Sequence, residues 1–325
     1  MDRRAFVRTS VLSLLAAPLA AEAQSVGRVF RIGVLAAGTG GGSTKIFRQS
    51  LSELGYVDGR NLAIEWREAE GKPERFADLA TELVRLKVDA IVAMAPAATF
   101  AAKRATAVIP IVMVNTPDPV QLGLVVSLAR PGGNITGATT LSADVSVKQL
   151  ELLKEAVPRA DRIAVLWNPT NPWHPLAVKG AEAATSSLAV QLQAVPARTP
   201  EELGNAFTAM TRARARAVLV LADPMFVFHQ SRIADLAVKH HLPTMFGGSR
   251  EVMDAGGLMY YWAHQADLFR RVASYVDRIL KGAKPADLAI EQPTRFELII
   301  NLKTAKTLGL AIPQSVLARA DEVIE

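Results

Sequence analysis

The sequence predicts an α/β protein with two doubly wound lobes, each built on a parallel sheet, and three segments that cross between them. From residue 28 onward, short β-branched runs alternate with helical periods, a pattern typical of βαβ units on parallel sheets. The same alternation begins again after about residue 140, without an obvious internal repeat. The last elements are too few to bury a core of their own, so we expect them to complete the two sheets by crossing between them.

The first lobe is expected to begin with a strand at 30–36, the Gly-rich loop 38–42 and a helix at about 44–54 that Gly55 caps. Further expected strands are 62–66, 90–94 and 109–114, and further expected helices are about 73–86 and 97–107. Together these elements predict one open sheet of four parallel strands.

The second lobe is expected to follow a Pro-Gly-Gly-Asn turn at 131–134, the segment 135–140 and a helix at 145–156. Its expected strands are 162–167, 191–195, 217–221 and 243–246, and its expected helices are about 175–188, 200–212 and 227–239. The end of the chain adds a strand at 256–261, an amphipathic helix at 266–281, a strand at 296–301 and a short helix that ends near Gly309.

The boundaries of the two lobes follow from these elements. We expect the first lobe to comprise 28–139 and about 263–292, and the second 140–262 and about 295–325. The crossovers are then expected near 139–142, 262–265 and 291–295.

The first residues have the order of a cleavable secretory signal. A basic region with Arg3 and Arg4 precedes an apolar run at 11–21, and an A-x-A triplet ends at Ala23. The apolar run is about half of the roughly 20 residues that a membrane-spanning helix needs, so we expect 1–23 to be removed as a signal peptide. The paired arginines with Phe6 resemble a twin-arginine signal, and an ordinary Sec signal is the alternative.

Composition narrows the class of protein further. The chain has no cysteine, which excludes disulfides, thiolate catalysis and lipid attachment through an N-terminal cysteine. We therefore expect a soluble periplasmic protein and not a lipoprotein. The formal net charge of +6 is mild, and the lysines and arginines are scattered, so we expect no nucleic-acid partner.

Enzyme signatures are thin. The loop 38–42 (GTGGG) does not match the dinucleotide pattern G-x-G-x-x-G, no G-x-S-x-G nucleophile elbow occurs, and the histidines show no H-E-x-x-H or comparable metal spacing. We therefore expect no catalytic residue, no metal and no cofactor. The alternative is an enzyme whose active site lies in the cleft, and turnover of a bound ligand would support it.

Three segments carry a family resemblance: 51–70 (LSELGYVDGRNLAIEWREAE), 118–137 (DPVQLGLVVSLARPGGNITG) and 283–325. They resemble a family of ABC-transporter substrate-binding proteins that is similar to the binding proteins of tryptophan and tyrosine importers. The resemblance implies a type I periplasmic-binding-protein fold, with two Rossmann-like lobes, three crossovers and a ligand cleft between the lobes. It also implies a small-molecule solute, a cognate permease with its ATPase as partner, and a monomer. The alternative is a sensory accessory that presents its ligand-bound form to a receptor or kinase.

Ligands of open α/β sheets bind outside the carboxyl ends of the strands, so each strand end nominates residues. The nominated residues in the first lobe are Thr39, Ser43, Thr44, Ala97, Thr99, Thr116 and Asp118. Those in the second lobe are Asn168, Asn171, Trp173, Asp223 and Phe246, and Thr140 and Tyr261 lie close to crossovers.

An amino-acid-like zwitterion fits these residues. A carboxylate suits the N–H and hydroxyl groups around 39–44 and 97–99, because a helix N-terminus carries partial positive charge. An ammonium group needs a fixed anion, for which Asp223 is the first choice and Asp118 the second. The family's Asn-Pro after one strand and Asp after a later one resemble Asn168, Pro169 and Asp223.

Each nomination has a structural alternative. Asp223 could serve as a cap of the next helix without binding a ligand, and so could Thr39, Ser43 and Thr44. Trp173 could pack on its own helix. Tyr260 and Tyr261 alternate along a strand, so one should face the cleft, and the resemblance favours Tyr261. Departures from the family pattern at Trp167, Trp173 and His174 leave open whether the solute is an aromatic or branched amino acid, an aromatic acid or a nucleoside.

Overall fold

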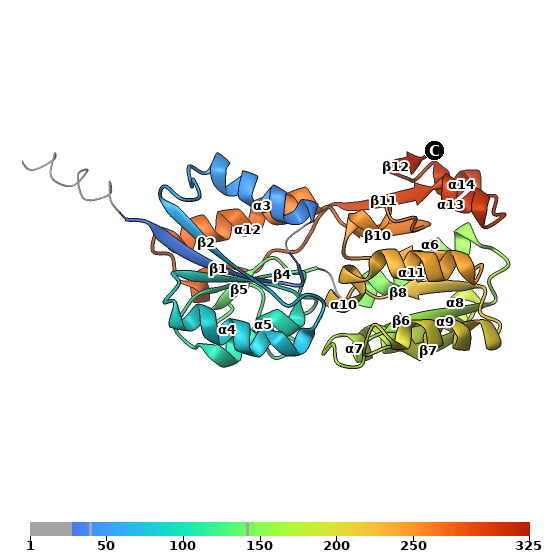
Figure 1. Cartoon of the computed structure of the whole chain (residues 1–325), viewed down its shortest axis with the longest axis horizontal. Helices are drawn as coiled ribbons and strands as arrows, with labels where there is room; N and C mark the ends of the chain where they lie inside the picture. Colours follow the sequence, from blue (N-terminus) through green and yellow to red (C-terminus); the bar gives the residue numbers. More distant parts are fainter. Residues whose placement is uncertain (1–27, 39–40, 141–142) are drawn as a thin grey trace, which may run out of the picture.

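The computed structural model describes residues 28–38, 41–140 and 143–325. Within these ranges the strands form two sheets, one of five strands and one of seven, and each sheet is the centre of its own lobe (Figure 1). The expected signal at 1–23 and the nominated residue Thr39 lie outside the described residues. No helix in the described part of the chain is both long enough and apolar enough to cross a membrane.

The first lobe is built on a fully parallel sheet with the strand order β2-β1-β3-β4-β5. Its strands are β1 (Phe30–Ala36), β2 (Leu62–Glu68), β3 (Ala90–Met94), β4 (Ile111–Val114) and β5 (Ile135–Gly137). Its helical elements are α3 (Gly42–Glu53), η1 (Pro73–Arg75), α4 (Phe76–Arg85), α5 (Pro96–Ala105), α12 (Gln265–Leu280) and η3 (Pro285–Asp287). The four predicted strands are present, and β5 adds a fifth because it pairs in parallel with β4.

The second lobe has the strand order β12-β11-β10-β9-β8-β6-β7, and its strands are parallel except for the antiparallel pair of β10 and β11. Its strands are β6 (Arg162–Trp167), β7 (Gln191–Pro196), β8 (Ala217–Val220), β9 (Thr244–Phe246), β10 (Met259–Ala263), β11 (Phe296–Asn301) and β12 (Glu322–Ile324). Its helical elements are α6 (Ala143–Ala156), α7 (His174–Ala183), α8 (Thr185–Leu188), α9 (Glu202–Arg212), α10 (Pro224–Phe228), α11 (Gln230–Lys239), η2 (Arg250–Val252), α13 (Leu302–Thr307) and α14 (Gln314–Leu317).

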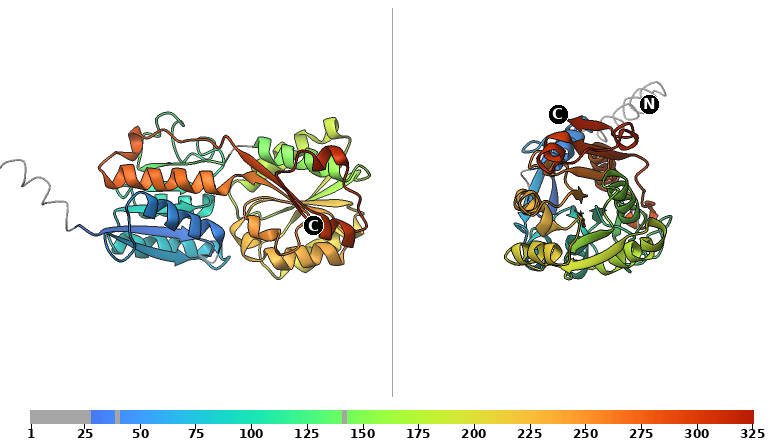
Figure 2. Two further views of the ribbon diagram at one scale, coloured as in Figure 1. Left: turned by 90° about the horizontal axis from the view of Figure 1, so that it is seen from above. Right: turned by 90° about the vertical axis from the view of Figure 1, so that its right-hand side faces the viewer.

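The last strands, β10, β11 and β12, all belong to the second sheet. The expected second lobe, 140–262 and about 295–325, already contained the segments that form them. Only the amphipathic helix α12, between β10 and β11, returns to the first lobe, where it packs beside α3 (Figure 2). Together with α3, this helix covers one apolar face of the first sheet.

Three neighbouring segments connect the lobes. The chain leaves the first lobe after β5, returns at His264 between β10 and α12, and crosses again at 291–295, before β11. The N–H of Thr139 donates to the carbonyl of Glu291 at 2.9 Å, and the N–H of His264 donates to the carbonyl of Arg295 at 3.0 Å. The expected three crossovers are therefore confirmed, and backbone hydrogen bonds tie them to one another.

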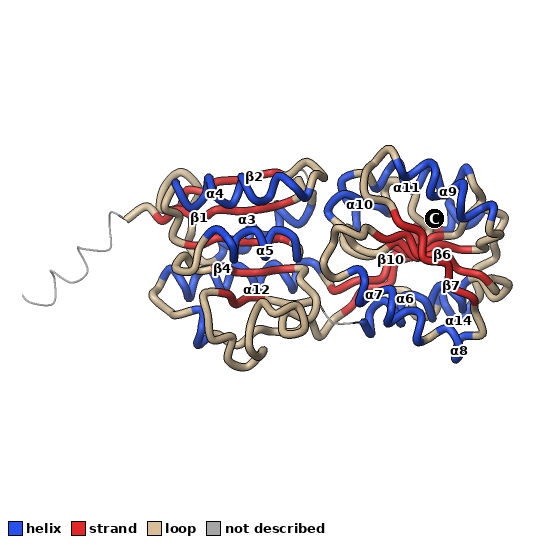
Figure 3. Tube along the Cα trace, turned by 90° about the horizontal axis from the view of Figure 1, so that it is seen from below, coloured by secondary structure: helices blue, strands red, loops and turns tan. Residues whose placement is uncertain are grey.

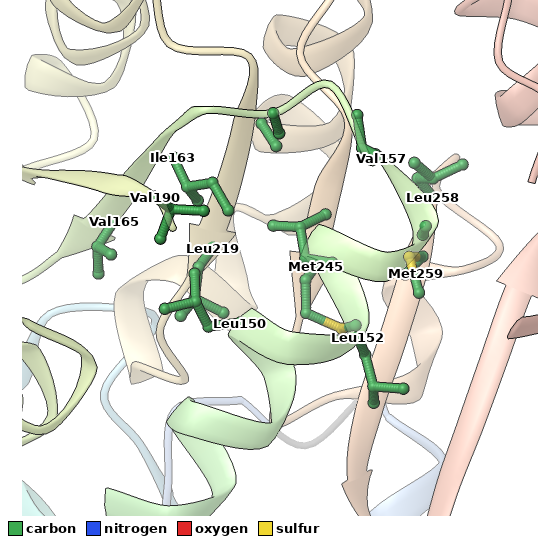
Figure 4. Packing of buried hydrophobic residues seen from close by; sticks show 14 of the residues in the cluster. Leu150, Leu152, Val157, Ile163, Val165, Val190, Leu219, Met245, Leu258 and Met259 are labelled. Carbon is green, nitrogen blue, oxygen red and sulfur yellow. The ribbon is translucent and has the colours of Figure 1, made fainter. Parts of the chain in front are cut away.

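Helices cover both faces of each sheet, which explains why central strands such as β3, β4 and β8 are apolar throughout (Figure 3). In β1, Ile32 packs under α3 and α12, whereas Leu35 packs toward α4 and α5. In the second lobe, Leu150 of α6 belongs to a cluster with Leu219 and Met245 of the sheet (Figure 4). Each lobe thus has its own core, and the space between the lobes is not needed for core packing.

A close approach of two strands yields a stability prediction. Gly137 in β5 has φ of 134°, and a Cβ there would lie 2.2 Å from the carbonyl oxygen and 2.7 Å from the nitrogen of Met113. Because both are backbone atoms of β4, Gly137→Ala should lower the free energy of unfolding by about 2 kcal/mol or more in urea denaturation.

The matched control is Gly133→Ala, where a Cβ meets nothing within 4 Å. Its unfolding free energy should change by less than about 0.5 kcal/mol. Equal stabilities of the two variants would mean that β5 tolerates a side chain against β4.

Candidate functional site

The order of the strands places a crevice in each lobe. The chain direction across the sheet reverses between β1 and β3 in the first lobe and between β6 and β8 in the second. Ligands of open α/β sheets bind at such points, outside the carboxyl ends of the strands. Residues that follow all four strands line a cavity of about 450 Å³ between the lobes. This volume lies within the range of roughly 300–1,000 Å³ that is usual for small-molecule sites.

The wall from the first lobe contains two non-glycine residues with unusual backbone angles. Ala95 after β3 has φ of 115° and Asn115 after β4 has φ of 54°, and both line the cavity. Such conformations cost on the order of 1–3 kcal/mol and persist where the surroundings over-determine them, commonly at ligand sites. The N-terminal turn of α3 adds Ser43 and Thr44 to the same wall.

The wall from the second lobe is organised around Asp223, which is 2% exposed. Its Oδ1 accepts the N–H of Met225 at 2.9 Å, as an N-cap of α10, and the side-chain amide of Asn168 at 3.2 Å. Its Oδ2 accepts the side-chain amide of Asn171 at 3.0 Å. Asp223 is thus a helix cap and a cavity-lining residue at once.

The loop after β6 holds both asparagines in the orientation that Asp223 requires. The Oδ1 of Asn168 accepts from the N–H and the hydroxyl of Thr170, at 3.0 and 2.8 Å. The Oδ1 of Asn171 accepts the N–H of Trp173 at 3.1 Å. Because each amide oxygen has its own donors, each Nδ2 is directed to the carboxylate of Asp223.

His174 lines the cavity as a neutral imidazole. The N–H of Asn168 donates to Nδ1 at 2.8 Å, so the ring hydrogen lies on Nε2, which donates to the carbonyl of Ala222 at 3.1 Å. Burial lowers the pKa of His174 below its ordinary value of 6.5, and this effect exceeds the opposing attraction of Asp223. His174 therefore adds no positive charge beside Asp223 at neutral pH.

Aromatic side chains form much of the remaining lining: Trp173, Phe228, Trp262 and Phe269. Two of them touch the opposite lobe. Trp262 of β10 donates from Nε1 to Oδ1 of Asn115 at 3.5 Å. Phe228 of α10 lies close to Gly71 of the first lobe: a Cβ added to Gly71 would be 2.9 Å from the Cβ of Phe228. The lobes are therefore in contact around the cavity.

The charged residues at the cavity carry one sign. Glu68, Asp223 and Glu251 are the carboxylates among the described residues that line it, and those residues include no lysine or arginine. With His174 neutral, the cavity is electronegative. Such a wall favours an ammonium group over a free anion.

A family model described as ABC transporter substrate binding protein matches residues 42–324. This chain belongs to that family. Its two-lobed fold is that of type I periplasmic binding proteins.

Individual proteins are also similar to this chain in sequence and in structure. A tyrosine-binding protein of Clostridioides difficile (strain R20291) is 27% identical over 267 residues, which cover 82% of this chain and 76% of that protein. A conserved domain protein of Vibrio cholerae is 25% identical with a TM-score of 0.84, over 91% of this chain and 100% of the other. An ABC domain from Streptococcus pneumonia in complex with L-Trp is 26% identical with a TM-score of 0.80, over 90% of this chain and 100% of the other.

In this ABC transporter substrate-binding protein, the cavity brings together some of the residues nominated from the sequence. Ser43, Thr44, Asn171, Trp173 and Asp223 line it, and Asn168 lies directly behind Asp223. Thr99 and Thr116 are fully buried beneath the wall of the first lobe, where their hydroxyl groups hydrogen-bond each other at 3.1 Å.

Other nominated residues lie away from the cavity. Asp118 accepts the N–H of Gln121 at 3.0 Å, and Ala97 packs against the core of the first lobe. Phe246 belongs to the core of the second lobe, because the last residue of β9 points into it. Thr140 is 1% exposed, and its hydroxyl has no hydrogen-bond partner among the described residues.

The tyrosine pair in β10 differs from the expectation in the same way. Tyr260 faces one core of the second lobe, and Tyr261 packs on the other side of the sheet, where its ring stacks on Phe296 with 5.5 Å between the centroids. The next residue, Trp262, reaches the cavity instead. The two tyrosines lie on opposite faces of the sheet as expected, but both pack into cores, and Trp262 lines the cavity instead of Tyr261, which the resemblance had favoured.

Sequence reasoning missed several lining residues, among them Glu68, Gln149, His174, Phe228, Glu251 and Trp262. Glu68 is the last residue of β2 and Trp262 the last but one of β10, so a rule based on strand ends could have found them. Gln149 and Glu251 carry no such signal, because a helix face and a short 3-10 turn bring them to the cavity.

The buried imidazole leads to a prediction on pH. Because the pKa of His174 is lowered in the folded state, the unfolded state binds a proton first as the pH falls below about 6.5. Wild type should therefore lose stability toward pH 5 more steeply than His174→Asn, by up to about 1.4 kcal/mol per pH unit. Urea denaturation at several pH values measures the difference.

The control for this experiment is His241→Asn. His241 is exposed with φ of 53°, a conformation that asparagine tolerates, so this variant should follow wild type. Parallel curves for wild type and His174→Asn would contradict a neutral His174.

Proposed function

We propose that this protein is the solute-binding component of an ABC importer and that its cavity takes an amino acid with an aromatic or other apolar side chain. The observation that carries the proposal is the oriented carboxylate of Asp223, fixed in a cavity that is otherwise rich in aromatic side chains. Asp223 supplies a fixed anion and the aromatic side chains an apolar enclosure, which are the two things that such a solute needs.

Asp223 suits an ammonium group for a reason of stoichiometry. A carboxylate offers about four lone-pair positions, and the hydrogen bonds from Met225, Asn168 and Asn171 use three of them. The remaining position can accept a donor from the cavity. Because the three donors are neutral, the negative charge of Asp223 is still available to a cation.

The apolar part of the solute has its own support. Trp173, Trp262 and Phe269 of α12 contribute to the lining of the cavity. Aromatic pairs gain stability beyond their buried area, which favours a solute with a ring. The relatives support the same class, since one is described as tyrosine-binding and another was solved with L-Trp.

Transport would follow from closure of the two lobes. A solute held between Asp223 on one lobe and the strand ends of the other favours the closed form by its differential contacts. The closed surface would then be presented to the permease, and no chemical step on the solute is required. The signal-like segment at 1–23 and the family together support action in the periplasm.

A binding experiment tests this proposal. In isothermal titration calorimetry, Asp223→Asn should weaken the binding of L-tryptophan at least about thirtyfold, because the ammonium group would lose its buried counter-charge. Asparagine is also a good N-cap, so α10 should keep its cap and the variant should fold.

Asp235→Asn on the exposed face of α11 is the matched control and should bind like wild type. Unchanged affinity in Asp223→Asn would place the ammonium site elsewhere. A wild-type protein that binds no amino acid at all would exclude the proposed solute class.

A further inference from the structure

The N-terminus of α3 is occupied by a side chain from the opposite lobe. The N–H of Gly42, the first residue of α3, donates to Oε1 of Glu251 at 2.5 Å. Glu251 lies in η2 of the second lobe, and its other oxygen accepts the hydroxyl of Ser249 at 2.5 Å. The carboxylate therefore bridges the two lobes at the edge of the cavity.

Two glycines make this approach possible. A Cβ on Gly42 would lie 2.9 Å from Oε1 of Glu251, and a Cβ on Gly41 would lie 3.3 Å from it. The described end of the Gly-rich loop thus forms a cradle for a carboxylate, which explains its composition without a nucleotide. In this structure the carboxylate in the cradle belongs to the protein.

Glu251 is an anion in this position. Burial raises the pKa of its carboxyl group, but the hydrogen bonds from Ser249, from its own N–H and from Gly42, with the attraction of Arg250, together hold the pKa below its ordinary value. The first turn of α3 contains no acidic residue of its own, and Gly41 at the N-cap has no side chain. Glu251 therefore meets the partial positive charge of α3 in place of a local cap.

We propose that Glu251 determines the charge specificity of the cleft: it fills the α3 N-terminus in the closed form, so that the cleft selects a solute with an ammonium group and rejects one that needs this N-terminus for a carboxylate. The inference rests on the proposed function, since it concerns the same cavity and solute class. It assigns the carboxylate of an amino acid to another part of the wall.

Two physical effects oppose a solute carboxylate at this end. It would have to displace a charge-assisted hydrogen bond that the protein has already formed, and it would lie beside a like charge in a partly desolvated space. An ammonium group meets neither obstacle. The selectivity thus depends on repulsion of a solute carboxylate by Glu251 as well as on attraction of the ammonium group.

Three indole compounds test the proposal because they differ mainly in charge: tryptamine is a cation, L-tryptophan a zwitterion and indole-3-propionate an anion. Their dissociation constants are measured by calorimetry at pH 7 for wild type, Glu251→Gln and the control Glu182→Gln. Glu182 is an exposed glutamate of α7, so the control makes the same change of charge on the surface of the second lobe.

The ratio of the dissociation constant of indole-3-propionate to that of tryptamine should be high in wild type and in Glu182→Gln. It should fall at least about tenfold in Glu251→Gln, because the like charge is removed while the shape of the side chain is kept. An unchanged ratio in Glu251→Gln would overturn the proposal.

A measurement without ligand separates this proposal from the proposed function. Small-angle X-ray scattering of the unliganded proteins should give a larger radius of gyration for Glu251→Gln than for wild type, because one contact between the lobes is weakened. Gly42→Ala displaces the same contact from the first lobe and should open the protein likewise.

If wild type binds neither these indole compounds nor any other amino acid, the proposed function fails, and scattering alone decides the role of Glu251. Larger radii for both variants would then support the occupation of the α3 N-terminus by Glu251. Equal radii for wild type and both variants would overturn it.

Discussion

The backbone bonds among the three crossovers are the constraint on which the site depends. Ala138 and Glu291 form a parallel bridge, and His264 donates to Arg295, so the three segments behave as one narrow ribbon. Such a connection is compatible with the proposed closure of the lobes and restricts sliding of one core past the other. The ribbon therefore keeps the carboxyl ends of both parallel sheets turned toward a common space.

The cavity is negative because no lysine or arginine among the described residues lines it beside its carboxylates. Asp223 is stabilised by neutral donors, and burial keeps His174 uncharged beside it. Glu251 finds its partners at a helix N-terminus and a serine hydroxyl. Asp223 and Glu251 keep the cavity negative while their hydrogen bonds are satisfied, and the neutral His174 does not offset that charge. This balance supports the proposed solute with an ammonium group.

Strand ends were the informative part of the sequence for locating the site. Asp223 and Asn171 could be nominated because each follows a strand beside the point where the chain direction reverses, and both line the cavity. The same rule also nominated Phe246 and Asp118, which serve a core and a turn instead. Sequence position specifies that a residue leaves a strand, but the path of the following loop decides whether its side chain turns to the cavity.

The sequence by itself determined the two doubly wound lobes, the three crossovers and the family, because alternating apolar periods and local motifs are properties of short segments. The tertiary structure alone decided that β5 adds a fifth strand to the first sheet and that β10 and β11 pair in antiparallel fashion. It alone placed Glu251 against Gly42, which are 209 residues apart in the chain. Such pairs depend on how two separately folded cores meet, and no local pattern in either segment encodes that meeting.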